Sequence, residues 1–131
     1  MKVIEKPILE RDLLQSLSRT IKQEKQVILH VRYANTALFG SLIRIWKSSY
    51  LLEHETGNRS ELIHAENISF FPVWTEIPPF ASYEFTLVFS GLSEECNEFD
   101  FVELIPQSGG FKIPNIKRNK SDVYRVELID L

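Results

Sequence analysis

Two runs of alternating apolar residues near the middle of the chain constrain its fold more than any other feature. The first run places Tyr83, Phe85, Leu87 and Phe89 at every second position. In the second run Phe99, Phe101 and Glu103 alternate with Asp100 and Val102. A period of two residues predicts β-strands with one buried face. The linker between the runs is too long for a two-residue hairpin, so we expect a wide loop or strands in facing sheets.

Other segments carry the same strand signal. Further strands are predicted at residues 27–33, 41–48, 50–55, 60–65, 111–116 and 123–129. Gly57-Asn58 is a favoured two-residue turn, so the segments around it form the clearest hairpin, in which His54 would lie opposite Glu61. Pro114 marks its strand as an edge strand. About eight or nine short strands indicate an all-β fold, and we expect an immunoglobulin-like β-sandwich of two antiparallel sheets.

Two segments are less regular. In residues 8–25 the apolar residues Leu9, Leu13, Leu17 and Ile21 recur every fourth position. This spacing suits a helix face or one side of a strand, and the alternating Ser16, Ser18 and Thr20 favour a strand. The segment 70–79 contains three prolines, so it cannot be an interior strand. We expect it to wrap an edge or one end of the sandwich, with its aromatic side chains as a plug.

Length and composition narrow the class of protein. The 131 residues suffice for one domain, 1–131, with 44% hydrophobic residues, 25% charged residues and a net charge of −3. The negative charge argues against a nucleic-acid partner, and the basic residues between 112 and 125 are read as a charged sheet edge. No run of about 18 apolar residues predicts a membrane span. Without a signal peptide the chain is expected in the cytoplasm, or outside it if a leader has been removed.

Several short stretches together resemble a known family. They are Leu42–Ile45, Tyr50–Glu53 with Thr56 and Gly57, Ile68–Pro72, Phe85–Phe89 with Leu92, Phe99–Glu103 and Gly110–Ile113. The family is an uncharacterised bacterial β-sandwich family, best known as an accessory domain in exported proteins and sometimes found ahead of a thioredoxin-like domain. The resemblance implies a sandwich and a strand near Leu17, and it implies no catalytic residues. The chain departs from the family in lacking an export signal and the downstream domain, and in carrying Ser90–Ser93 where a proline-bounded turn is common.

The residues that bear chemistry do not form a catalytic or metal-binding pattern. In the predicted hairpin His54 and His64 lie on opposite faces and cannot share an ion. The acidic residues between 94 and 100 read as a solvated loop, because calcium needs six to eight converging oxygens. The single cysteine, Cys96, can form no intramolecular disulfide, and its acidic neighbours raise the pKa of a thiol and disfavour a nucleophile. We therefore predict no enzyme, no metal and no cofactor.

Aromatic residues give the best functional candidates. They are Trp46, Tyr50, Phe70, Phe71, Trp74 and Phe80. Ligand-binding and partner-binding surfaces are rich in exposed Trp and Tyr, and the flanking prolines single out Trp74 as a surface residue. The predicted binding residues are Trp74, Trp46, Tyr50 and Phe71. We predict a non-catalytic binding or protein-interaction module whose partner is another protein or a second copy of the chain, bound through an edge strand or the aromatic surface. The alternative is a small-ligand or carbohydrate-binding domain.

Overall fold

The computed structural model describes residues 25–35 and 38–129, and these form an all-β fold. The strands are β1 Val27–Ala34, β2 Ser41–Ile43, β3 Ser49–Glu53, β4 Arg59–Glu66, β5 Thr75–Ile77, β6 Ser82–Phe89, β7 Glu98–Glu103, β8 Lys112–Lys117 and β9 Val123–Ile129. The all-β prediction is confirmed. The strand predicted at 8–25 lies outside the described residues except for Lys25.

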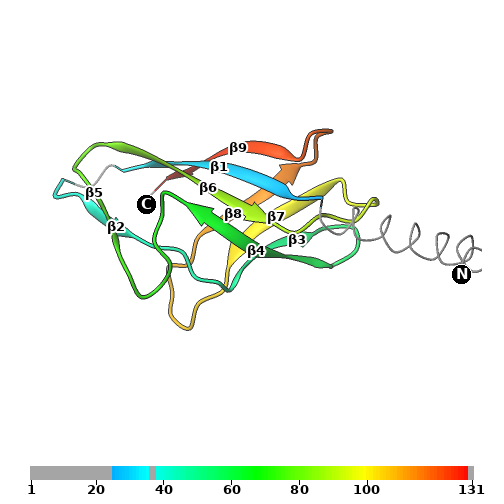
Figure 1. Cartoon of the computed structure of the whole chain (residues 1–131), viewed down its shortest axis with the longest axis horizontal. Helices are drawn as coiled ribbons and strands as arrows, with labels where there is room; N and C mark the ends of the chain where they lie inside the picture. The colour runs from blue at the N-terminus through cyan, green and yellow to red at the C-terminus, as the bar shows by residue number, and fades with distance from the viewer. Residues whose placement is uncertain (1–24, 36–37, 130–131) are drawn as a thin grey trace, which may run out of the picture.

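Seven strands form one curled sheet in the order β8-β7-β3-β4-β6-β1-β9. All neighbours are antiparallel except β1 and β9, which are parallel. Figure 1 shows β9, β1 and β6 above β3 and β4, so that the sheet curls into two layers. Because β4 pairs with both β3 and β6, hydrogen bonding is continuous and the sheet resembles an incomplete barrel. The immunoglobulin-like arrangement of two sheets is not confirmed.

The core lies between the two layers of this sheet and follows the predicted alternation. The buried apolar and aromatic residues from β1, β6 and β7 are Val27, Leu29, Val31, Tyr33, Phe85, Leu87, Phe89, Phe99 and Phe101. The rings of Phe89 and Phe101 meet edge to face at 5.9 Å between centroids, and Phe99 meets Tyr124 of β9 at 5.1 Å. These contacts hold the layers together. The predicted edge strand, β8, does lie at one end of the strand order.

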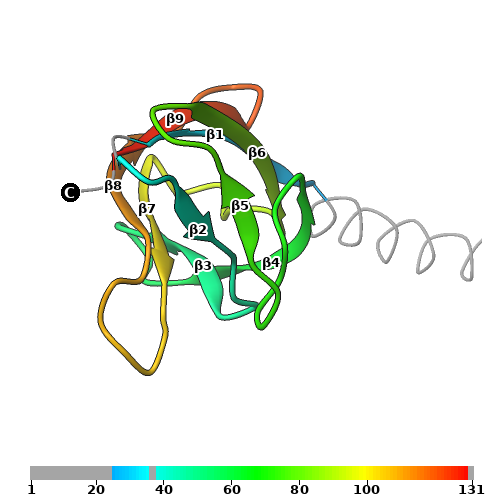
Figure 2. The same cartoon turned by 90° about the vertical axis from the view of Figure 1, so that its left-hand side faces the viewer.

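A short ribbon of β2 and β5 covers one end of the curled sheet (Figure 2). Ile43 and Ile77 are its buried residues, at 4% and 3% exposure. Gly40 precedes the ribbon with φ of 85°, and a Cβ there would lie 2.6 Å from the Ile77 carbonyl oxygen, so this close approach requires glycine. β5 falls within the segment predicted to be irregular, and Ile77 is buried there, whereas Phe71 and Trp74 are exposed. The prediction of an aromatic plug is therefore wrong for Phe71 and Trp74, whereas Phe70 is partly buried and packs against the core.

The hairpin of β3 and β4 has a different register from the predicted one. Tyr50 pairs with Glu61, so the prediction that His54 lies opposite Glu61 is wrong. The turn closes instead at Glu53, whose amide donates to the carbonyl of Asn58 at 2.9 Å. Glu53 is buried, and its carboxylate accepts hydrogen bonds from the hydroxyls of Thr56 and Ser93. Because the buried Glu53 carboxylate needs these hydrogen bonds, the loop between β3 and β4 is longer than the two-residue turn predicted at Gly57-Asn58.

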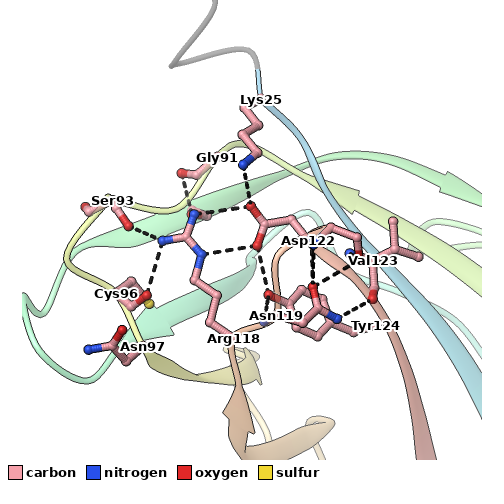
Figure 3. A network of polar contacts seen from close by, with 12 residues as sticks. Lys25, Gly91, Ser93, Cys96, Asn97, Arg118, Asn119, Asp122, Val123 and Tyr124 are labelled. Atoms are coloured by element: carbon pink, nitrogen blue, oxygen red, sulfur yellow. Dashed lines mark hydrogen bonds and ion pairs between the residues drawn. The ribbon is translucent and has the colours of Figure 1, made fainter.

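A polar network joins the loop before β7 to the turn between β8 and β9, at the other end of β1 from the ribbon (Figure 3). Arg118 donates from Nε and Nη2 to the two oxygens of Asp122, each at 3.2 Å. Its Nη1 donates to the carbonyls of Ser93 and Cys96. Tyr124 donates its hydroxyl to Asp122 at 2.8 Å. We call Arg118, Asp122 and Tyr124 the clasp, because they tie the turn between β8 and β9 to the loop before β7.

Burial raises the pKa of the Asp122 carboxyl, but hydrogen bonds from Arg118 and Tyr124 outweigh it and the net pKa is lowered. Burial raises the pKa of Tyr124 to about 12. Burial also raises the pKa of the nearby Cys96 thiol to about 11, with the charges of Glu53 and Glu55 adding to the effect. The upward shift predicted for this thiol is confirmed.

Candidate binding site

The most unusual cluster of side chains in the described structure centres on Arg44. Its guanidinium carbon lies 3.7 Å from the ring centroid of Trp74, 4.6 Å from that of Phe71 and 5.8 Å from that of Trp46. The rings of Trp46 and Phe71 stack at 3.8 Å with 25° between their planes. Cation–π contacts of this kind hold a guanidinium in one plane. The cluster brings together three of the four predicted binding residues around an arginine.

Backbone pairing between two distant segments explains why these side chains meet. Ile45, which is fully buried, forms an isolated parallel bridge with Phe70. The amide of Ile45 donates to the Ser69 carbonyl, and the amide of Phe71 donates to the Ile45 carbonyl, both at 2.9 Å. Because side chains alternate along an extended segment, burying Ile45 turns its two neighbours, Arg44 and Trp46, the other way. There they meet the side chain of Phe71.

A small hollow of about 280 Å³ lies beside the cluster. Its lining includes Tyr33, Leu42, Arg44, Trp46, Glu103 and Phe111. Glu103 is 7% exposed, and its two oxygens accept hydrogen bonds from the amides of Trp46, at 2.9 Å, and Phe111, at 3.2 Å. Burial raises the pKa of the Glu103 carboxyl, and these amides offset the effect only in part. The carboxylate thus fixes the backbone that shapes the hollow.

Exposed apolar side chains gather at the same end of the molecule. Of the eleven large apolar residues exposed in the described chain, seven flank or belong to β2 and β5: Leu38, Phe39, Leu42, Phe71, Val73, Trp74 and Phe80. We call these seven residues the apical face. Phe39 is 91% exposed, and with Leu42 it lines a second, wider hollow of about 700 Å³. Grouped apolar exposure of this kind marks interaction surfaces, whereas scattered exposure does not.

The structure separates the fourth predicted residue from the others. Tyr50 lies in β3, where it pairs with Glu61 and Val102, and the guanidinium of Arg59 covers its ring at 4.3 Å. It does not line the hollow beside Arg44. Trp74 is 48% exposed, as its flanking prolines predicted, while its role in binding stays a prediction.

Sequence reasoning missed Arg44 and the apolar residues before β2. The available signal was the alternation of buried Ile43 and Ile45 with Arg44 and Trp46, which places the arginine and the tryptophan on one face. No signal in the sequence placed Phe71 and Trp74 against them. Phe39 falls between the strands predicted at 27–33 and 41–48, where exposed aromatic residues carry no periodic pattern.

The histidine and acidic residues form surface pairs. His54 Nε2 lies 2.7 Å from Asp100 Oδ1, and His54 Nδ1 lies 3.5 Å from Glu98 Oε1. The hydrogen bond with Asp100 raises the pKa of His54 despite some opposing desolvation. Across residues 25–35 and 38–129, no group of three or more His, Cys, Asp or Glu residues is arranged to hold a metal ion. The same residues contain no helix long and apolar enough to cross a membrane.

In comparisons with known proteins, no family model matches the chain, and no curated protein or solved structure does either. The resemblance to the bacterial accessory-domain family therefore stays a prediction. Functional inference depends on the geometry of the site itself.

Proposed function

We propose that this protein is a non-catalytic binding module that engages a protein partner through the apical face. The observation that carries the proposal is that seven exposed apolar residues lie in or near β2 and β5, and that Phe39, Leu42 and Trp74 among them line two hollows. Aromatic residues and arginine are the residue types most enriched in binding hot spots, and Arg44 with Trp46 and Trp74 supplies both. The opposite end supports the same assignment, because its polar groups bond to one another.

A partner-capture experiment with matched variants tests this proposal. Phe39→Ser and Trp74→Ala alter the apical face, whereas Ile63→Ser removes an apolar residue that is 53% exposed in β4. We expect a partner retained by the wild-type chain and by Ile63→Ser to be lost by both apical variants. The interaction is then rebuilt from purified components, where the apical variants should raise the Kd by roughly tenfold or more, as expected for hot-spot residues. Equal Kd values for all variants would refute the apical assignment.

The second candidate function is binding of a small ligand or a carbohydrate. It is favoured by Trp46 and Trp74, which line the hollow together with polar groups and offer aromatic surfaces for a sugar ring. A saturable change in tryptophan fluorescence with a mono- or oligosaccharide, in place of a protein partner, would support it. A flat titration across a panel of sugars would remove it.

We also propose that the fold is related to the immunoglobulin-like sandwich. Two layers of strands with aromatic contacts between them support this relation. Hydrogen exchange tests this relation: rapid exchange of the amides that pair β4 with β6 would support two separate sheets, whereas slow exchange on both sides of β4 would support one continuous, barrel-like sheet.

A further inference from the structure

The guanidinium of Arg44 has donors that the described structure leaves unused. Its Nη1 donates to the Pro72 carbonyl at 3.2 Å. A guanidinium carries five N–H donors, and no carboxylate in residues 25–35 and 38–129 forms an ion pair with Arg44. The ring centroids of Phe71 and Trp74 lie 4.6 and 3.7 Å from its central carbon. These rings hold the group in place, while its remaining donors form no hydrogen bond within the described residues and are available to a ligand.

Glu103 lines the same hollow but does not satisfy Arg44. Its two oxygens are engaged by the amides of Trp46 and Phe111. Arg44 still lies close enough for its charge to lower the pKa of Glu103, against the larger effect of burial. The hollow thus presents one cation with open donors beside a carboxylate that is already hydrogen-bonded to the backbone.

The shape of the hollow limits what can enter it. Its volume of about 280 Å³ is below the range of roughly 300–1,000 Å³ typical of pockets that enclose a whole ligand. Tyr33, Leu42 and Phe111 give it apolar walls. It lies between β2 and the loop before β8, and in the strand order of the described residues β2 pairs with β5 alone. Extended peptides add to sheet edges of this kind and place terminal groups in adjoining pockets.

We propose that this hollow binds the C-terminal carboxylate of a partner's polypeptide chain. The carboxylate accepts paired hydrogen bonds from Arg44, a geometry that guanidinium and carboxylate groups share. The last side chain of the partner packs against Tyr33, Leu42 and Phe111. A C-terminal residue fits better than an internal Asp or Glu, because it carries a carboxylate and an apolar side chain on the same residue. The inference rests on the proposed function and specifies what the partner presents.

Tryptophan fluorescence provides a site-specific test. The chain has two tryptophans, Trp46 and Trp74, and both contact Arg44, so the whole signal comes from the site. The probes are hexapeptides ending in Leu, Val or Phe with a free carboxylate, and the same peptides with a C-terminal amide. We expect the free-carboxylate peptides to bind saturably. The Kd of the amidated peptides should be at least roughly tenfold higher, because they lose hydrogen bonds between charged groups.

Matched variants assign the effect to the guanidinium. Arg44→Gln keeps a planar polar side chain and should bind acid and amide peptides equally. Arg59→Gln removes a comparable arginine that covers Tyr50 away from the hollow, and it should behave like wild type. If Arg44→Gln does not fold, Leu42→Glu places a carboxylate at the hollow and should weaken binding of the acid peptides more than that of the amides.

Three results would overturn the inference. The first is equal affinity of the wild-type protein for free-carboxylate and amidated peptides. The second is the absence of saturable binding by any of the peptides. The third is binding of amidated peptides that contain an internal Asp, which would reassign the site to acidic side chains. If peptides fail while Phe39→Ser still weakens a purified partner, the carboxylate inference falls and the proposed function stands. If peptides bind but apical variants leave partner affinity unchanged, the proposed function falls alone.

Discussion

Two arginines at opposite ends of the molecule are held in contrasting ways. Arg118 donates four hydrogen bonds, to a buried carboxylate and two carbonyls, so the described structure uses four of its five donors. Arg44 lies within 5.8 Å of the centroids of three aromatic rings and donates one hydrogen bond, to Pro72. Donors that are satisfied within the fold serve stability, whereas donors that are positioned but unused are available for binding. We therefore propose that the clasp end serves folding and that the apical end serves recognition.

The largest effect is expected from Asp122→Ala, which breaks the clasp. Asp122 is 1% exposed, and its loss leaves Arg118 and the hydroxyl of Tyr124 without their acceptor. Removing one partner of a buried ion pair costs about 3–5 kcal/mol of unfolding free energy. Urea denaturation followed by circular dichroism measures this loss. A loss of less than about 1 kcal/mol would mean that the clasp stabilises the fold no more than an exposed ion pair does. The two ends of the molecule would then not differ in their contribution to stability.

The two ends should also respond oppositely to acid. The net pKa of Asp122 is lowered from its ordinary 3.8, so its stabilising contribution is present above the unfolded pKa and is lost as the pH falls through the folded pKa. The pKa of Glu103 is raised above 4.5, so its contribution is present below the unfolded pKa and is lost as the pH rises through the folded pKa. Carbon-13 NMR titration of the two carboxyl groups measures both values. Shifts in the same direction would contradict this contrast.

A smaller effect on stability is expected from Trp74→Ala at the apical end. Its side chain is half-exposed, and its contact with Arg44 is a cation–π interaction. Such contacts contribute about 0.5–1 kcal/mol at exposed sites, so the unfolding free energy should fall by about 1 kcal/mol while affinity for a partner falls sharply. Measuring both the unfolding free energy and the Kd for a partner separates a structural role of Trp74 from a binding role. A loss of several kcal/mol would show that Trp74 is part of the core.

The alternating pattern predicted much of the fold. Phe85, Leu87 and Phe101 are buried as their period of two requires, because a strand with one apolar face must cover it. Pro114 lies in an edge strand because proline cannot donate to a ladder. Which face of a strand is buried, and whether a strand lies at a sheet edge, can be predicted from its own residues without knowing what the strand packs against.

Contacts between distant segments were not predictable. The curl of the sheet depends on β4 pairing on both sides and on a parallel pairing of β1 with β9, neither of which leaves a local signal. The hairpin register depends on burial of Glu53, which overrides the preferred turn at Gly57. In the same way, Arg44 meets Trp74 only because Ile45 bridges to Phe70. The aromatic residues of the site were recognisable by type, whereas Arg44 and the contacts among these residues became apparent only in the fold.

The comparison of Arg44→Gln with Arg118→Gln in urea denaturation tests the central claim most directly. We expect Arg118→Gln to lower the unfolding free energy by about 3–5 kcal/mol, because buried Asp122 then keeps only the exposed Lys25, 3.6 Å away, as a cation. We expect Arg44→Gln to lower it by about 1 kcal/mol, the scale of exposed cation–π contacts. An equal loss for both variants would show that Arg44 is as much a structural residue as Arg118, and the apical end would lose its assignment as a binding site.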